Sequence, residues 1–518
     1  MKKSFVKSAT LMMAATLVAK IIGACYRIPL TNLLGAEGMG LYQLVYPVYA
    51  LILTASSGAL PLAISVLVSE KNVGGNLKSG NSVVKSAFSI LGLLGIFMAI
   101  ILMLTSGLIG SLQGAKGASF GYIMIAPSIA FVSGIAVLKG YFQGNHLMYP
   151  TALSQLCESL VKLIAGLGFV ALLKGEPIEY QVAGALFGVS VSEGVTFLIL
   201  FIMYRRKSPP LKLFVSFKEA REEYKEILKI SLPITIGGMI FPLTQFIDSF
   251  MVVNILKGSV GSALATANYG LFSGPVSTLI NLPVSLSLAL GIAVVPHLSQ
   301  NRTEHNLYAI RLKTSTAIKL AVFVGVPFTT IFIVMPERVL GFLYGSLSES
   351  QIALSAELLK ITAPTVLLLS ITQICTSVLQ GLKDTKSPIR NLLIGGVSKI
   401  VASIILLYTL GIKGVAYAQL IAFSVTAILN LISVGQLMGK NRDVIKNSGV
   451  ILLFGGIIGV SLTIAVSYKL NMIFIVLITL LSGIIYLVAV MTSKVFSTEE
   501  LMSIPFGQHI VRLKKSPK

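Results

Sequence analysis

Residues 17–30, LVAKIIGACYRIPL, place two cations in a run that is otherwise apolar enough to cross a bilayer. A Lys or Arg at the centre of a membrane helix costs about 2.5 to 3.5 kcal/mol on insertion scales, so each cation needs compensation. Lys20 and Arg27 are seven residues apart, which places them on one helix face about 10 Å from each other along the axis. No acid stands three or four residues from either one. We expect acids of other helices, such as Glu158 or Glu193, or an anionic ligand to compensate this face.

The composition around this stretch is that of an integral membrane protein. Of the 518 residues, 55% are hydrophobic and only 12% are charged, unlike a soluble globular domain. The net charge of +22 does not indicate nucleic-acid binding, because the cations fall in short gaps between apolar runs. We therefore expect a multi-pass protein of the cell membrane with no nucleic-acid partner. Lys20 interrupts the first apolar run, which favours an uncleaved helix over a secretory signal.

Apolar runs of about 20 residues, the length that crosses a hydrocarbon core of about 30 Å, predict an all-α fold with fourteen transmembrane helices. The predicted spans are 5–32, 40–68, 86–110, 118–138, 151–173, 181–204, 229–254, 266–295, 314–335, 352–380, 391–410, 414–437, 447–467 and 471–493. Lys and Arg test this count because they gather on cytoplasmic connections. The predicted outer loops carry six of the 41 basic residues, namely Lys116, Lys174, Lys257, Arg338, Lys413 and Lys469. Most of the others lie on the alternate connections and the termini, so we expect both termini in the cytoplasm.

Two pairs of segments repeat along the chain. They are YFQGNHLMYPTALSQLCESLVKLIAG with SVLQGLKDTKSPIRNLLIGGVSKIVAS, and ALPLAISVLVSE with LALGIAVVPHLSQ. In the first pair, the Gln-Gly that precedes Lys162 and the Gln-Gly that precedes Lys399 stand at the same distance from their lysines. In the second pair, Ala63 and Ala293 are equivalent.

The repeats predict two six-helix lobes followed by two further helices. The expected parts are a first lobe 1–207, a linker with an amphipathic helix 208–228, a second lobe 229–437, two C-terminal helices 438–493 and a cytoplasmic tail 494–518. An even number of helices per lobe makes the repeat parallel, with its axis along the membrane normal. This arrangement favours a cleft between lobes that opens to each side in turn.

Ionisable residues inside the apolar runs are the strongest pointers to a functional site. Glu158 and Lys162 are four residues apart with the acid first, the favourable order for a pair on one helix. A structural salt bridge and a substrate role are both open for them. Glu193, in the sixth run, has no local partner and is a weaker candidate. Asp248 and Lys399 each stand alone, and we predict that they pair within the second lobe.

Other charged groups have simpler interpretations. Lys229, Lys319 and Lys360 lie within two or three turns of a helix end, where a lysine can snorkel to the interface. No Gly-rich phosphate-binding loop is present, the four histidines are scattered, and most loops are short. We therefore expect neither an enzyme nor a bound cofactor, although transport could still be coupled to the membrane potential, Na⁺ or H⁺.

Three stretches carry a resemblance to a known family: GACYRIPLTNLLGAEGMGLYQLVYPVY, LPLAISVLVSE and NLPVSLSLALGIAVVPHLSQ. They resemble the polysaccharide-transporter branch of the multidrug/oligosaccharidyl-lipid/polysaccharide (MOP) exporter superfamily, and within it the stage V sporulation protein B-like group and the MurJ-type lipid II flippases. The likeness extends to about residue 493. It implies a fourteen-helix flippase that turns an undecaprenyl-pyrophosphate-linked cell-wall precursor from the inner to the outer leaflet, together with cell-wall synthesis proteins as partners.

The resemblance also assigns roles to individual residues. Basic residues of the first helix line the central cavity in the MurJ-type proteins, and Lys20 and Arg27 match them in kind. An arginine of that family in the eighth helix corresponds here to Thr278, which weakens the assignment to lipid II. Some family members bind sodium near an acid of the seventh helix. That acid would be Asp248, and Lys399 could instead occupy the place of the ion.

The sequence thus predicts an alternating-access flippase for a lipid-linked oligosaccharide, with membrane lipid as its surroundings. The saccharide is open, so precursors of teichoic acid or capsule are alternatives to lipid II. A multidrug cation antiporter of the same superfamily is the main rival, but that function favours acids in the first lobe, where the first helix offers bases. A non-transporting scaffold or a polymerase is a third class.

Overall fold

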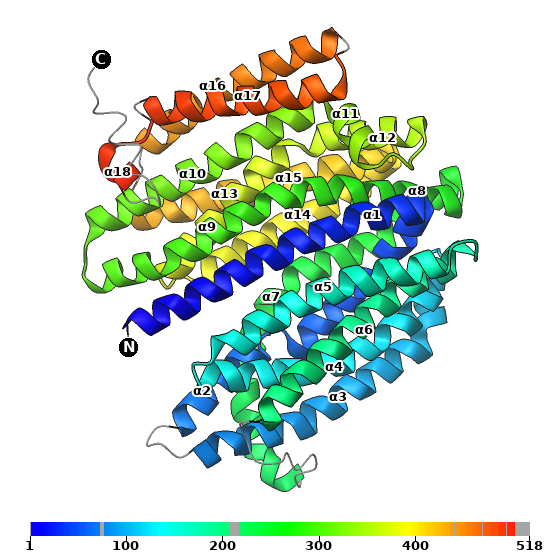
Figure 1. Cartoon of the computed structure of the whole chain (residues 1–518), viewed down its shortest axis with the longest axis vertical. Helices are drawn as coiled ribbons and strands as arrows, with labels where there is room; N and C mark the ends of the chain where they lie inside the picture. The colour runs from blue at the N-terminus through cyan, green and yellow to red at the C-terminus, as the bar shows by residue number, and fades with distance from the viewer. Residues whose placement is uncertain are drawn as a thin grey trace. The chain divides into compact units, whose positions relative to one another are not determined.

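The computed structural model describes residues 2–72, 77–206, 217–439, 442–468, 470–493 and 495–502 and consists of helices joined by short loops (Figure 1). The helices are α1 (Lys2–Ser57), α2 (Leu60–Lys71), α3 (Leu77–Leu112), α4 (Ala118–Gly144), α5 (Met148–Leu172), α6 (Ile178–Arg205), α7 (Phe217–Val260), α8 (Ser262–Leu271), the π-helical turn η1 (Phe272–Val276), α9 (Ser277–Thr303), α10 (Leu307–Val334), α11 (Pro336–Leu343), α12 (Glu349–Thr362), α13 (Pro364–Gly381), α14 (Lys386–Leu410), α15 (Ile412–Met438), α16 (Arg442–Ser467), α17 (Met472–Thr492) and α18 (Thr498–Met502). Packing divides the chain into two compact units, residues 1–275 and 276–518. The lobes 1–207 and 229–437, expected from the sequence repeat, have a different boundary from these units. The division into two lobes stays a prediction.

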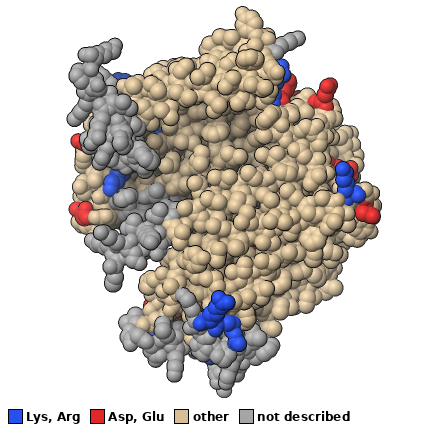
Figure 2. Space-filling view, in the orientation of Figure 1, with Lys and Arg blue, Asp and Glu red and all other residues tan. Residues whose placement is uncertain are grey.

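Thirteen helices of the described ranges are long and apolar enough to cross a membrane, so the prediction of an all-α multi-pass protein is confirmed. The face seen in Figure 2 agrees, since large areas without Lys, Arg, Asp or Glu separate the few charged side chains. The first of the thirteen, Ala14–Lys71, has 58 residues. A straight helix of that length would measure about 87 Å, nearly three times the thickness of a hydrocarbon core.

A single glycine explains how this long segment fits. Within α1, Gly35 has φ 66° and ψ −170°, a conformation that is essentially reserved for glycine. Arg27 precedes this glycine and Tyr46 follows it, yet the guanidinium carbon of Arg27 lies 5.9 Å from the ring centre of Tyr46. In a straight helix the two residues would lie about 28 Å apart along the axis. The chain therefore turns back at Gly35, and in Figure 1 α2 lies at the opposite end of the first unit from the label of α1.

The turned-back part of α1 crosses α8 at a very close approach. A Cβ at Gly40 would overlap the Thr266 carbonyl, and a Cβ at Gly270 would overlap backbone atoms of Ala36 and Gly40. Small residues allow such backbone contact between membrane helices, where van der Waals packing drives association. Gly40 and Gly270 are separated by the same offset as the second repeated pair of segments, so they are equivalent positions of the repeat.

The packing of each unit supports the internal repeat. In the first unit a Cβ at Gly144 would lie 2.8 Å from Cβ of Val68, and in the second a Cβ at Gly381 would lie 3.1 Å from Cβ of Leu298. Val68 and Leu298 are again equivalent positions of the second repeated pair. Each glycine thus ends its helix against the equivalent position of a neighbouring helix, which explains why both repeats keep a glycine there.

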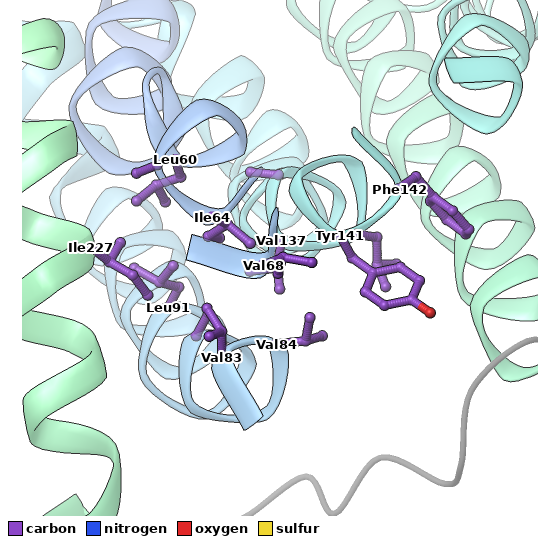
Figure 3. Packing of buried hydrophobic residues seen from close by; sticks show 14 of the residues in the cluster. Leu60, Ile64, Val68, Val83, Val84, Leu91, Val137, Tyr141, Phe142 and Ile227 are labelled. Atoms are coloured by element: carbon purple, nitrogen blue, oxygen red, sulfur yellow. The ribbon is translucent and has the colours of Figure 1, made fainter. Parts of the chain in front are cut away.

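An apolar core fixes one end of the first unit. Residues of α2, α3 and α4 meet in it, and Ile227 of α7 joins them (Figure 3). Ile64 and Val68 of α2 and Val83 of α3 have no exposed surface. Leu200 and Tyr204 of α6 belong to the same core, which therefore binds the start of α7 to α2, α3, α4 and α6.

The segment expected to be a surface helix after a linker is instead the beginning of α7. The linker residues 207–216 lie outside the described ranges, but the helix from Phe217 continues without interruption to Val260. Glu223 accepts hydrogen bonds from Lys71 Nζ at 2.7 Å and from Ser82 Oγ at 2.6 Å. The acidic side of this helix thus binds the end of α2 and the beginning of α3.

Lys319 does not snorkel, so that prediction was wrong. Its side chain in α10 is only 4% exposed, and Nζ lies 2.8 and 2.9 Å from the two carboxylate oxygens of Glu500 in α18. Nζ also donates to the Val495 carbonyl at 3.0 Å, and Ser315 Oγ donates to Glu500 at 3.0 Å. The sequence interpretation missed this pair because Glu500 is far away in the chain, in the expected cytoplasmic tail. Residues 495–502 of that tail are packed against α10.

Glu500→Ala should destabilise the second unit by about 3 to 5 kcal/mol, because it leaves a buried ammonium without its carboxylate. The double change Lys319→Met with Glu500→Leu should recover most of that loss, since apolar groups of similar volume replace the whole pair. Thermal unfolding of the purified protein in detergent measures both effects. A Glu500→Ala protein as stable as wild type would contradict the assignment.

Candidate functional site

The two cations of the first span are both accessible in the structure. Lys20 is exposed and Arg27 is half-buried, and both lie before the turn at Gly35. Among the residues that the structure describes, no ion pair joins either cation to a carboxylate. The contact described for the Arg27 guanidinium is the face of Tyr46, at 5.9 Å.

Glu158 of α5 lies between two lysines from different helices. Its Oε1 is 3.3 Å from Lys162 Nζ one turn further along α5, so the predicted i,i+4 pair is present. Its Oε2 is 3.9 Å from Lys139 Nζ of α4. The three side chains are between 16% and 25% exposed. Since Glu158 is engaged by both lysines, it is not the counter-ion of Arg27.

Glu193 completes this arrangement. It is 5% exposed in α6, and its side chain lies within hydrogen-bonding reach of Glu158. We call Lys139, Glu158, Lys162 and Glu193 the charge group. Three helices of the first unit, α4, α5 and α6, thus bring two acids and two bases together.

Tyrosines of α1 connect the charge group to Arg27. Tyr42 is buried and interacts electrostatically with both Arg27 and Lys162. Tyr42 and Tyr46 stack at 5.8 Å between ring centres, and Tyr46 meets Tyr49 edge-on at 5.9 Å. The predicted substrate-binding residues Arg27, Glu158, Lys162 and Glu193 therefore lie in one region of the first unit.

Sequence reasoning missed Lys139 and the tyrosines. The fourth predicted span, 118–138, stops one residue before Lys139, whereas α4 continues to Gly144. The apolar residues on both sides of Lys139 were a signal that the helix continues. Tyr42, Tyr46 and Tyr49 recur at helical spacing, and only the turn at Gly35 brings them beside Arg27.

The second unit keeps one of the four members of the charge group at a matching position, since Lys399 stands where Lys162 does. At the offset that relates Lys162 to Lys399, Lys139 becomes Thr376 and Glu158 becomes Gly395. A buried amide network joins α13, α14 and α15 there instead. Asn391 donates to Asn430 at 2.9 Å, and Asn430 donates to Thr376 at 3.3 Å. The second junction thus keeps one of the four charges, Lys399, and neutral residues replace the other three.

The remaining predicted pair lies in separate units. Asp248 is 5% exposed in α7 of the first unit, and Lys399 lies in α14 of the second. Their pairing stays a prediction. Within the described ranges no three His, Cys, Asp or Glu side chains gather as metal ligands, and sodium binding near Asp248 also stays a prediction.

Comparison with known proteins identifies the family. The family described as "Polysaccharide biosynthesis protein" matches residues 5–302, more than half of the chain, and the MatE family matches residues 233–409. The chain belongs to the polysaccharide biosynthesis protein family, within the MOP superfamily of membrane transporters. These are transporters and not enzymes, and the resemblance seen in the sequence is confirmed.

Two curated relatives extend over nearly the whole chain. Stage V sporulation protein B of Bacillus subtilis (strain 168) is 27% identical over 99% of this chain and 100% of its own length. Lipid II flippase MurJ of Bacillus subtilis (strain 168) is 23% identical over 90% of this chain and 89% of its own length. The chain is thus a distant homologue of both proteins.

Solved structures show the same fold. The inward closed conformation of lipid II flippase MurJ matches with a TM-score of 0.71 at 18% identity, covering 92% of this chain and 98% of that one. The inward-facing conformation of a multidrug resistance MATE family transporter matches with a TM-score of 0.63 at 17% identity, covering 83% and 98%. At these identities the likeness concerns the fold alone.

Glu158→Ala should destabilise the first unit by about 1 to 3 kcal/mol more than Lys139→Ala. Removing the acid leaves two lysines with only Glu193 nearby, whereas removing Lys139 leaves the 3.3 Å pair with Lys162 intact. Thermal unfolding of the two variants in detergent gives the order. Equal stability of the two variants would mean that the 3.9 Å contact with Lys139 matters as much as the pair within α5.

Proposed function

We propose that this protein moves a polyprenyl-pyrophosphate-linked saccharide from the inner to the outer leaflet by alternating access. The observation that carries the proposal is the accessible pair of cations, Lys20 and Arg27, which have no ion-pair partner among the described residues. Arg presents a planar fork of donors that suits phosphate oxygens. A pyrophosphate would supply the missing negative charge during transport.

The exposure of these charges favours a water-filled space beside them. Lys139, Glu158 and Lys162 keep between 16% and 25% of their side-chain surface, although they belong to candidate membrane spans. Charged side chains within spans almost always face a protein interior or an aqueous cavity, because exposure to lipid is costly. We place the headgroup of the substrate in that space, with Lys20, Arg27, Lys162, Glu158 and Glu193 as its binding residues.

The identity of the saccharide is a finer proposal. Relatives named for lipid II flipping and for sporulation support a precursor of peptidoglycan, whether vegetative or sporulation-specific. Thr278 is a buried, uncharged residue where the resemblance leads us to expect an arginine, and this favours keeping teichoic and capsular precursors as alternatives. Cell-wall synthesis proteins are the partners that such a substrate implies.

A multidrug cation antiporter is the second candidate, and the MatE match and the MATE fold support it. Glu158 and Glu193 are acids in the first unit, as that function requires. Glu158, however, is engaged by two lysines, and Arg27 lies in the same region. An organic cation would meet an excess of positive charge there, so we favour the anionic substrate.

The fourteen-helix arrangement belongs to the same proposal. We assign two crossings to the 58-residue segment Ala14–Lys71, joined at Gly35, which turns thirteen candidate segments into fourteen spans. An even number of spans puts both termini on the same side, and the distribution of Lys and Arg favours the cytoplasm. Asp248 and Lys399 would serve coupling, either as a pair or with Asp248 holding sodium, and the membrane potential or protons are the alternative driving forces.

Arg27→Ala should abolish complementation of a flippase-deficient strain while the protein still inserts at normal levels. The loss of one charge-assisted contact should weaken binding of the pyrophosphate by about 1.5 to 3 kcal/mol. Arg27→Lys should rescue in part, because the charge survives but the planar fork does not. Accumulation of the lipid-linked precursor on the inner leaflet is the direct measurement.

Arg206→Ala is the matched control, since it removes an arginine at the end of α6 and should leave complementation unchanged. If Arg27→Ala transports normally, or fails to accumulate in the membrane, the cation is structural and the proposal fails. Uptake of an organic cation driven by protons or sodium would favour the antiporter instead.

The topology has its own test. In a version without the three native cysteines, a cysteine placed beside Lys174 should react with an impermeant reagent added from outside the cell, and one beside Arg206 should not. These positions lie at opposite ends of α6 (Ile178–Arg205), so the reagent must distinguish them if the helix crosses the membrane. The reverse pattern would overturn the assignment of both termini to the cytoplasm.

A further inference from the structure

Arg27 has an aromatic neighbour where a carboxylate would be expected. The Tyr46 ring centre lies 5.9 Å from the guanidinium carbon, within the range of a cation–π interaction. Among the described residues no acid pairs with this arginine, and Glu158, on a helix packed against α1, is engaged by two lysines. A cation in a membrane span requires some compensation, and the Tyr46 ring is the cation–π contact of Arg27 that the structure shows.

The ring of Tyr46 is fixed before any ligand arrives. It stacks on Tyr42 with an angle of 15° between the planes and meets Tyr49 edge-on. Tyr42 and Tyr49 are 3% and 4% exposed, whereas Tyr46 itself is half-buried. Two packed neighbours thus hold the ring, and the Arg27 guanidinium carbon lies 5.9 Å from its centre.

An aromatic partner differs from an acidic one in a way that matters for anion binding. A carboxylate would neutralise Arg27 and would have to be displaced by the phosphate oxygens of a ligand. The ring attracts the cation through its quadrupole and leaves the net charge and the N–H donors available. A site that must capture and release an anion therefore benefits from a ring in place of a permanent counter-ion.

We infer that Tyr46 is a positioning residue that holds the Arg27 guanidinium through its ring face and keeps the positive charge free for the pyrophosphate of the substrate. This inference rests on the proposed function and deepens it. It assigns a role to the part of α1 that follows Gly35, because the turn at Gly35 brings Tyr46 back beside Arg27. The phenol oxygen of Tyr46 has no part in the role, so a phenylalanine should replace the tyrosine.

Binding of undecaprenyl pyrophosphate to the purified full-length protein in lipid nanodiscs tests the inference. Tyr46→Leu should weaken binding about threefold to tenfold, the range expected for loss of one cation–π contact, and Tyr46→Phe should bind as wild type. Tyr46→Met is a second variant without a ring, and its flexible side chain fills the space if the leucine protein is unstable. Tyr180→Leu removes an exposed tyrosine of α6 and is the matched control, with no change expected.

A double-mutant cycle with Arg27→Ala separates the outcomes. If the ring acts through the arginine, Tyr46→Leu should cause little further loss once Arg27 is alanine. Weak binding by Arg27→Ala together with wild-type binding by Tyr46→Leu and Tyr46→Met would overturn the role of the ring and leave the proposed function intact. An equal loss in Tyr46→Phe and Tyr46→Leu would also overturn it, because the hydroxyl would then be the active group. Wild-type binding by Arg27→Ala would overturn both proposals.

Discussion

The turn at Gly35 is the constraint on which the first unit depends. With φ 66° it takes a conformation that a side chain strains, although no atom lies within 4 Å of the place where a Cβ would stand. Position 35 therefore requires glycine because of the backbone conformation, and not because a side chain would clash with its neighbours. The turn divides a segment that is too long for a single crossing and lays two limbs of one helix side by side. The contact of Arg27 with Tyr46 and the crossing of Gly40 with α8 both follow from it.

The two units handle polar groups inside the membrane differently. In the first unit α4 and α5 hold lysines and a glutamate that remain partly accessible, and α6 adds the buried Glu193. In the second, Asn391, Asn430 and Thr376 form a neutral network, and Asn391 is fully buried. Both junctions are held by polar contacts between helices, but Thr376, Gly395 and Asn430 stand in the second at positions equivalent to three of the four charges of the first. The buried pair of Lys319 with Glu500 is a separate case, because it fastens the C-terminal segment to α10.

The parts that the sequence predicted depend on local pattern. Apolar runs indicated the helices because the length and composition of a span are properties of consecutive residues. The pair of Glu158 with Lys162 was visible for the same reason, as it lies within one helical turn. Lys139, Tyr46 and Glu500 were not assigned to their partners, because each contact joins segments that are distant in the chain or separated by a turn. Spacing alone does not specify which helices become neighbours, so within the charge group only the contact of Glu158 with Lys162 could be predicted from the sequence.

The close contact of Gly40 with Gly270 bears on how such a protein arises. If one gene encoding half of the chain once formed a symmetric homodimer, equivalent residues of the two copies could touch only on the two-fold axis, where each meets its own image. A substitution there would have changed both sides of the interface at once, which leaves little choice besides a residue without a side chain. Duplication and fusion would free the two sides to diverge. One turn further on the equivalent positions of the repeat hold Gln43 and Ser273, and Gln43 donates to the Ser273 carbonyl at 2.7 Å. Gly40 and Gly270 have not diverged, because two backbones still occupy that point.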